Sequence, residues 1–189
     1  MAFYGCTNLT DINIPKSVTT IGKGVFDLCY SLKSVTFEDG DIELAIGTSD
    51  RASINACGLF YYCPLEYVYL GRDLSYTIVT QAEGPFYNKT QLTTLIIGDK
   101  VTYVGLKAFG GCTGITSITC KALTPPDIKS YAFSNVDTTI PLYVPAESIN
   151  TYVEASIWAN FTNIQAIPIN LITFTVEGVE YQAEEGMTW

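Results

Sequence analysis

Residues 2–14, AFYGCTNLTDINI, decide the fold because altered copies of this stretch recur along the chain. Each copy has a phenylalanine, a small or polar residue three positions later, and then three mostly aliphatic positions. The close copies are Phe3, Cys6, Leu9, Ile12, Ile14; Phe26, Cys29, Leu32, Val35, Phe37; Phe86, Lys89, Leu92, Leu95, Ile97; and Phe109, Cys112, Ile115, Ile118, Cys120. The looser copies are Phe60, Cys63, Leu65, Val68, Leu70 and Phe133, Val136, Thr139, Leu142, Val144. Self-similarity at a nearly fixed period is the sequence signature of a solenoid.

The spacing and the internal pattern of the copies predict the kind of solenoid. Successive repeat phenylalanines lie 23, 34, 26, 23 and 24 residues apart, which fits a leucine-rich-repeat coil. The end of each copy alternates apolar and polar residues, so we expect a half-buried strand with Ile12 and Ile14 inward and Asp11 and Asn13 outward. Residues 18–22 and 101–105 form a second alternating stretch. The prediction is a mainly β solenoid of about six irregular rungs.

Composition excludes several classes of function. The chain has 189 residues, 10 Lys and Arg against 19 Asp and Glu, and a net charge of −9. An acidic chain does not favour nucleic acid or anionic membrane surfaces as partners. No apolar run approaches the ~18 residues of a membrane span, so we expect no membrane insertion. The chain has no histidine, the commonest general base and metal ligand, so we assign no catalytic residue, no metal and no cofactor.

The cysteines follow the repeat. Cys6, Cys29, Cys63 and Cys112 each lie three residues after a repeat phenylalanine, whereas Cys57 is off the pattern. A residue type fixed to one phase of a repeat is most simply a small buried apolar group. We therefore expect free buried thiols. Disulfides between stacked rungs remain the alternative, and zinc is disfavoured because no CxxC pair exists.

The residues resemble a known family. AFYGCTNLTDINIPKSVTTIGKGVF is similar to the BspA-like leucine-rich repeat pattern A-F-x-x-C-x-x-L-x-x-I-x-I-P followed by V-x-x-I-G-x-x-A-F. The resemblance covers residues 2–167. It implies an extracellular or cell-surface bacterial protein, and some members of the family are adhesins. No signal peptide is visible and the chain starts inside a rung, so we expect a fragment of a longer protein.

The pattern changes near the C-terminus. Residues 146–158 place Ile149, Tyr152, Val153 and Trp158 on one helical face, and we expect this helix to cap the last rung. Residues 163–167 should form a short strand. Residues 171–183 read as a hairpin with a Glu177-Gly178 turn. We therefore divide the chain into a capped solenoid, residues 1–167, and a hairpin, residues 168–189, that begins a truncated following module.

Two long intervals depart from the period. Residues 38–58 and 71–85 carry extra or altered residues, and insertions in solenoids map to loops on one face that is often functional. Simple drift in loop length is the alternative. Residues 38–41, EDGD, resemble a weak calcium loop but lack the regular oxygen ladder of an EF-hand, which favours a solvated turn.

The outward face of the repeated strand is the candidate binding site. Neighbouring strands lie ~4.8 Å apart, so outward positions form a continuous ribbon. Tyrosines and apolar residues at its centre suit a binding hot spot, although cross-strand pairs that merely stabilise the sheet would look the same. The candidate ligand-binding residues are Tyr67, Tyr69, Ile96, Thr94, Thr36 and Tyr143. A second candidate, on the loop side, is Tyr61, Tyr62 and Tyr87.

These observations lead to a function by class. We expect a non-enzymatic binding or adhesion module that holds a protein or glycan ligand of unknown identity through the exposed strand face. The alternatives are a structural spacer that displays other domains and a hydrolase that uses carboxylates. The open N-terminal rung could also support self-association, because an unpaired strand edge invites pairing.

Overall fold

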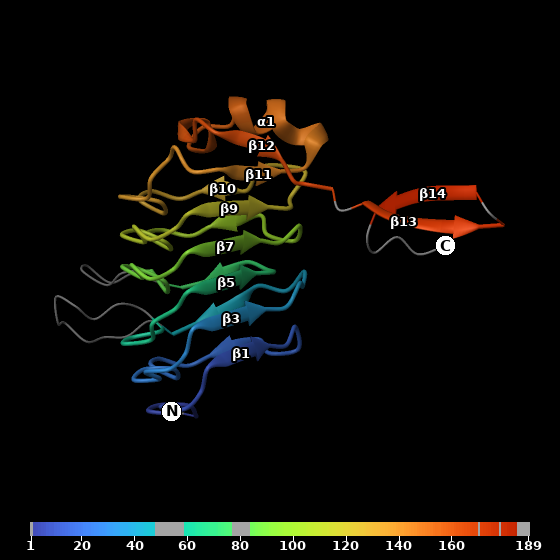
Figure 1. Ribbon diagram of the computed structural model, residues 1–189. Helices are drawn as coiled ribbons and strands as arrows, with labels where there is room; N and C mark the ends of the chain where they lie inside the picture. The colour runs from blue at the N-terminus through green and yellow to red at the C-terminus, as the bar shows by residue number, and fades with distance from the viewer. Residues whose placement is uncertain (1, 48–58, 77–83, 170, 178, 185–189) are drawn as a thin grey trace.

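The computed structural model describes residues 2–47, 59–76, 84–169, 171–177 and 179–184. The chain winds into a parallel β-solenoid whose rungs stack along one axis (Figure 1). One strand from each rung joins a main sheet of seven strands. In spatial order they are β1 (Asp11–Ile14), β3 (Ser34–Phe37), β5 (Tyr67–Leu70), β7 (Thr94–Ile97), β9 (Ser117–Cys120), β11 (Leu142–Val144) and β12 (Ile164–Ala166). The predicted leucine-rich-repeat solenoid is confirmed.

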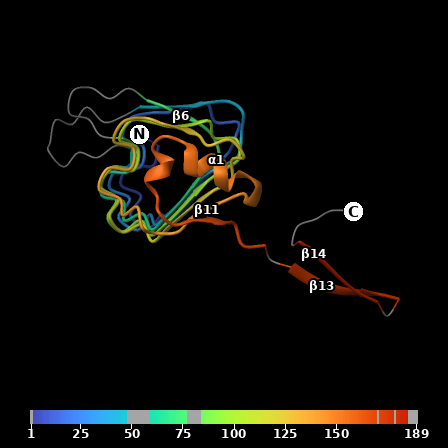
Figure 2. The same cartoon turned by 90° about the horizontal axis from the view of Figure 1, so that it is seen from above.

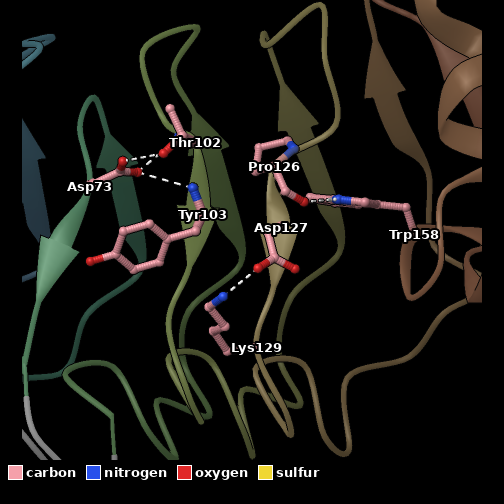
Figure 3. A network of polar contacts seen from close by, with 7 residues as sticks. All are labelled: Asp73, Thr102, Tyr103, Pro126, Asp127, Lys129 and Trp158. Carbon is pink, nitrogen blue, oxygen red and sulfur yellow. Dashed lines mark hydrogen bonds and ion pairs between the residues drawn. The ribbon is translucent and has the colours of Figure 1, made fainter.

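The return side of the rungs forms two smaller parallel sheets. One contains β2 (Thr20–Ile21), β4 (Leu44–Ile46) and β6 (Leu74–Ser75), and the other contains β8 (Tyr103–Val104) and β10 (Asp127–Ile128). Between β6 and β8 a side chain replaces the backbone ladder, since the Asp73 carboxylate accepts the Thr102 and Tyr103 N–H groups at 2.8 and 3.1 Å (Figure 3). The return side is therefore interrupted where the main sheet is continuous.

A stack of phenylalanine rings runs through the solenoid. Consecutive repeat phenylalanines lie 4.9–5.8 Å apart between ring centroids, at interplanar angles of 2–16°. Phe26, Phe60, Phe86 and Phe109 are at most 1% exposed. Such ring pairs contribute ~0.5–1.5 kcal/mol each beyond the area they bury. The phenylalanine positions read from the sequence therefore form the dry spine of the fold.

The turn that holds each phenylalanine has a left-handed residue two positions after the ring. These residues are Gly5, Leu28, Tyr62, Asn88, Gly111 and Asn135, with φ between +57° and +75°. Glycine and asparagine tolerate this conformation, whereas a bulky side chain there is strained by roughly 1–3 kcal/mol. Leu28 and Tyr62 are the two bulky members at this position. Lys107 and Tyr131, each two residues before a repeat phenylalanine, also have positive φ.

In four of the rungs, the side chain three residues after the phenylalanine bonds the preceding rung. The thiols of Cys29, Cys63 and Cys112 donate to the carbonyl oxygens of Phe3, Phe26 and Phe86 at 3.0–3.1 Å. In the rung where Lys89 replaces the cysteine, its ammonium donates to the Phe60 carbonyl at 2.5 Å. In these four rungs the position holds a buried donor, whereas Val136 in the last copy is a buried apolar residue without a donor. Cys6, Cys29, Cys63, Cys112 and Cys120 are all free, and Cys57 lies outside the described residues.

The C-terminal cap is more broken than the single helix predicted over residues 146–158. A 3₁₀ turn (Ala146–Ser148), α1 (Ile149–Glu154) and a second 3₁₀ turn (Trp158–Asn160) follow one another, because Ala155 adopts an extended conformation. Tyr152 and Trp158 are buried as predicted, and Ile149 packs against the core. Val153 was wrongly placed on the inner face, since it is 52% exposed.

Polar anchors fix the cap over the last rung. The Trp158 indole N–H donates to the Pro126 carbonyl at 2.7 Å (Figure 3). The Tyr152 hydroxyl donates to the Ala122 carbonyl at 2.7 Å. Trp158 and Phe161 each lie 5.8 Å from the Phe133 ring, so aromatic residues also end the phenylalanine stack. The cap covers the apolar end of the coil, which terminal repeats of solenoids require.

The predicted hairpin follows the solenoid. β13 (Leu171–Val176) and β14 (Val179–Glu184) pair antiparallel, with Val176 opposite Val179. Figures 1 and 2 show the hairpin to one side of the solenoid, joined to it by the segment after β12. The division at residues 167 and 168, and the hairpin as the start of another module, stay predictions.

Thiol reactivity tests the buried cysteine column. Burial raises the pKa of Cys63 and Cys112 to about 12, from an ordinary value of 9.0. At about pH 8 these thiols are protonated and unreactive, because the thiolate is the nucleophile. We expect iodoacetamide to label the exposed Cys6 in the folded protein, and to label Cys29, Cys63, Cys112 and Cys120 only after unfolding in urea. Mass spectrometry of peptides reads the result, and rapid labelling of Cys63 or Cys112 in the native state would contradict this packing.

Candidate functional site

The strand register brings the outward side chains into two columns, as the sequence predicts. Adjacent strands of the main sheet pair in parallel without a shift of register. The first column contains Asp11, Ser34, Tyr67, Thr94 and Ser117. The second contains Asn13, Thr36, Tyr69, Ile96, Thr119 and Tyr143. We call the outward surface of these columns the sheet face.

Four of the six candidate residues form a compact block at the centre of the sheet face. Tyr67 lies opposite Thr94, and Tyr69 lies opposite Ile96. Thr36 borders Tyr69 on the preceding strand, so it extends the block by one rung. Tyr143 is separate, because the Thr119 rung lies between it and Ile96. All six side chains are partly exposed, so they are accessible to a partner while they pack against their neighbours in the sheet.

Tyr69 is held in place from two sides. Its hydroxyl donates to the Asp39 carboxylate at 2.8 Å, and the Lys121 ammonium lies 5.3 Å from its ring centroid. Burial, and then the hydrogen bond to Asp39 with its negative charge, raise the pKa of the Tyr69 hydroxyl above its ordinary value. The hydroxyl therefore stays a donor, and the ring has a fixed orientation on the sheet face.

Glycines at the strand ends make room for this arrangement. Gly71 and Gly98 follow β5 and β7 at the same corner of neighbouring rungs. A Cβ at Gly98 would lie 2.6 Å from an Asp39 carboxylate oxygen and 3.0 Å from the Gly71 Cα. Any larger residue at Gly98 would displace the carboxylate that fixes Tyr69.

A buried arginine secures the same corner. Arg72 is 0% exposed and donates to the carbonyl oxygens of Pro15, Lys16 and Val18 at 2.8–3.0 Å. It thereby ties the third rung to the first. Part of the interval 71–85 that departs from the repeat is therefore structural, while residues 77–83 lie outside the described part of the chain.

The acidic stretch at residues 38–41 is engaged by other side chains. Glu38 accepts the Lys16 N–H at 3.0 Å and the Asn13 amide at 2.7 Å, and these bonds lower the pKa of its carboxyl. Asp41 pairs with Lys100 at 3.4 Å. With Asp39 bonded to Tyr69, the three carboxylates point to three different partners. The carboxylates act as corner contacts, as expected for a solvated turn.

The second candidate group lies at the turns that carry the phenylalanines. The Tyr61 and Tyr62 rings are 4.1 Å apart between centroids, and the Tyr30 ring lies 6.1 Å from that of Tyr62. A hollow of about 210 Å³ opens beside Tyr62. Tyr87 belongs to the next rung and is partly buried. The sequence pattern did not predict Tyr30 or the hollow, although Tyr30 lies four residues after Phe26, just beyond the repeated cysteine.

The described residues contain neither a candidate metal site nor a candidate membrane helix. Among them, no group of three His, Cys, Asp or Glu side chains could hold a metal ion. No helix in that part of the chain is long and apolar enough to cross a membrane.

Comparison with known proteins identifies the repeat. Residues 1–77 and 79–177 match the BspA type Leucine rich repeat region in six copies. A search of curated proteins finds no match. The match covers most of the chain and agrees with the rungs, spine and strand register described above. The chain therefore belongs to the BspA type leucine-rich repeat family.

Proposed function

We propose that this chain is a non-enzymatic binding module of a bacterial surface or secreted protein, and that its sheet face holds a protein partner. The observation that carries the proposal is the block of Tyr67, Tyr69, Thr94 and Ile96 at the centre of an unshifted parallel sheet. Tyrosines in packed central positions are the residues that dominate protein interfaces. The membership in a repeat family of this type supports a role in interaction.

The chemistry of the face favours a protein over a small ligand. Its columns run along the whole stack of strands, so a partner can contact several rungs at once. The Asp39 and Lys121 charges flank an aromatic and aliphatic centre, which resembles the apolar core and polar rim of protein interfaces. A fixed Tyr69 ring also loses little entropy on binding.

The alternatives make different demands. A structural spacer depends on the phenylalanine spine and the cap, and its role does not depend on which residues occupy the sheet face. A hydrolase using carboxylates needs two of them to face one another across a substrate, whereas Glu38, Asp39 and Asp41 are engaged by different partners. The surface location rests on the family resemblance.

The sheet-face proposal is tested with Tyr67→Ala combined with Ile96→Ala. These two residues lie on the sheet face without the Asp39 bond that ties Tyr69 to the scaffold, so their removal spares the corner. We expect partners found on an array of host and bacterial surface proteins to bind the double variant at least about tenfold more weakly, because central aromatic residues each contribute on the order of 2 kcal/mol. Surface plasmon resonance measures the affinities.

The matched control is Tyr131→Ala, which removes an exposed tyrosine from a turn away from the sheet face. It should leave the affinity unchanged. Equal binding by the double variant and the wild-type chain would reject the sheet face and favour the spacer. Loss of binding in both variants would also reject it.

We also propose that the first rung mediates self-association. Among the described residues, nothing pairs with the outer edge of β1, and Phe3 and Tyr4 beside it are 38% and 41% exposed. The Phe3 ring stacks on Phe26 at 5.5 Å, and no other ring among the described residues stacks on it. A second copy meeting this end would continue both the ladder and the ring stack.

Light scattering over a range of protein concentrations tests this contact. We expect the wild-type chain to form dimers at high concentration and Phe3→Asp to remain monomeric, because a carboxylate would be buried without a partner. Val153→Asp, an exposed position on the opposite end of the solenoid, should behave as wild type. A wild-type chain that is monomeric at every concentration would overturn the proposal.

A further inference from the structure

Tyr62 combines backbone strain with an exposed aromatic ring. Its φ is +60°, and its side chain is 57% exposed, so packing does not explain a tyrosine here. The same turn position holds glycine in the rungs of Phe3 and Phe109. Leu28 and Tyr131 share this left-handed conformation, so the strain at Tyr62 points to a site only together with the groups around its exposed ring.

The ring of Tyr62 belongs to an aromatic cluster. Tyr61 lies 4.1 Å away at 51°, and Tyr30 of the preceding rung lies 6.1 Å away at 47°. Tyr30 is 55% exposed. The three tyrosines lie in the turns that precede β3 and β5, and we call this side of the solenoid the turn edge. This edge is separate from the sheet face.

A hollow of about 210 Å³, lined by both polar and apolar groups, adjoins the cluster. It is lined by Tyr62, Cys63, Pro64, Leu65, Asn88, Lys89, Thr90 and Gln91. The lining side chains that reach solvent are mainly Asn88, Thr90 and Gln91 beside the Tyr62 ring, and none of these four carries a charge at neutral pH. The Lys89 ammonium is buried, and it donates to the Phe60 carbonyl. The mouth of the hollow thus offers uncharged donors and acceptors next to an aromatic plane.

We propose that this hollow binds one residue of a neutral glycan. The apolar C–H face of a sugar ring would stack on Tyr62, while the Asn88 and Gln91 amides and the Thr90 hydroxyl would bond its hydroxyl groups. The volume is below the ~300–1,000 Å³ of sites for drug-sized ligands, so it takes a single ring rather than a longer segment. Neighbouring sugar residues would lie along the exposed Tyr30 ring.

Two other ligand classes fit the hollow less well. An anionic glycan or phosphate needs cations, and the lining ammonium already faces a carbonyl inside the turn. An extended proline-rich peptide also binds aromatic surfaces, but it docks in grooves lined by several rings. Among the described residues that line this hollow, Tyr62 alone is aromatic. The amide-rich wall at residues 88–91 is better matched to the many hydroxyl groups of a sugar.

The test titrates the whole chain with maltohexaose, cellohexaose and chitohexaose, following binding by calorimetry and by ligand-detected NMR. We expect at least one of these hexasaccharides to bind and Tyr62→Gly to weaken it at least tenfold. Because glycine adopts the left-handed turn freely, the urea midpoint of Tyr62→Gly should not fall. Gln91→Ala should also weaken binding, since it removes a hydroxyl partner without touching the strained turn.

The chain provides a matched control in Tyr131. Its φ of +59° and its exposure of 68% resemble those of Tyr62, but it does not line the hollow. Tyr131→Gly should preserve sugar affinity, and so should the sheet-face pair Tyr67→Ala and Ile96→Ala. The proposals of a glycan site and of a protein-binding sheet face can therefore be rejected independently of each other.

Three results would overturn the glycan site. The first is no binding of any of the three hexasaccharides by the wild-type chain at millimolar concentration. The second is unchanged affinity in both Tyr62→Gly and Gln91→Ala. The third is tight binding of decaproline that Tyr62→Gly abolishes, which would assign the hollow to extended peptides instead.

Discussion

The stacking of one phenylalanine ring on the next is the interaction on which the structure depends. No rung can bury its own apolar side, so each ring is covered by the ring of the following turn. Phe86 and Phe109 show the closest fit, at 4.9 Å and 2°. The donors three residues later reinforce the stack by bonding the carbonyl of the preceding phenylalanine. The use of Lys89 in one rung shows that a thiol is not the only donor that reaches this carbonyl. Val136 shows that the last copy has no side-chain donor at this position.

This constraint leaves the surface free to vary. Because the spine fixes the register of neighbouring strands, the outward residues form columns whatever their identity. The features that distinguish this chain accordingly lie at positions whose residue type the spine does not fix. The sheet face carries Tyr67, Tyr69 and Ile96, and the turn edge carries Tyr62 in a strained conformation. Rigid rungs thus present two surfaces of different chemistry on different sides of one coil.

Periodicity predicted the features that repeated burial controls, and it also predicted the burial of Tyr152 and Trp158 in the cap. The rungs, the inward residues and the outward columns follow from residues 2–14 and their copies, because each rung repeats the same burial. The Asp39 and Lys121 contacts to Tyr69 come from corners of other rungs, and no spacing in the sequence links them. The break between β6 and β8 arises where the Asp73 carboxylate accepts hydrogen bonds from backbone N–H groups of the next rung. A pattern of apolar residues cannot predict such a contact. The cap was predicted as one helix because periodicity cannot detect the extended conformation of Ala155 that ends α1.

A double-mutant cycle on Phe86→Leu and Phe109→Leu, measured by urea unfolding, tests the central claim most directly. If adjacent rings stabilise each other, the pair should show a coupling free energy of about 0.5–1.5 kcal/mol. The pair Phe26 and Phe86, separated by Phe60 in the stack, should show coupling near zero. Equal coupling in the adjacent and the separated pair would contradict the ring stack as the interaction that organises this solenoid.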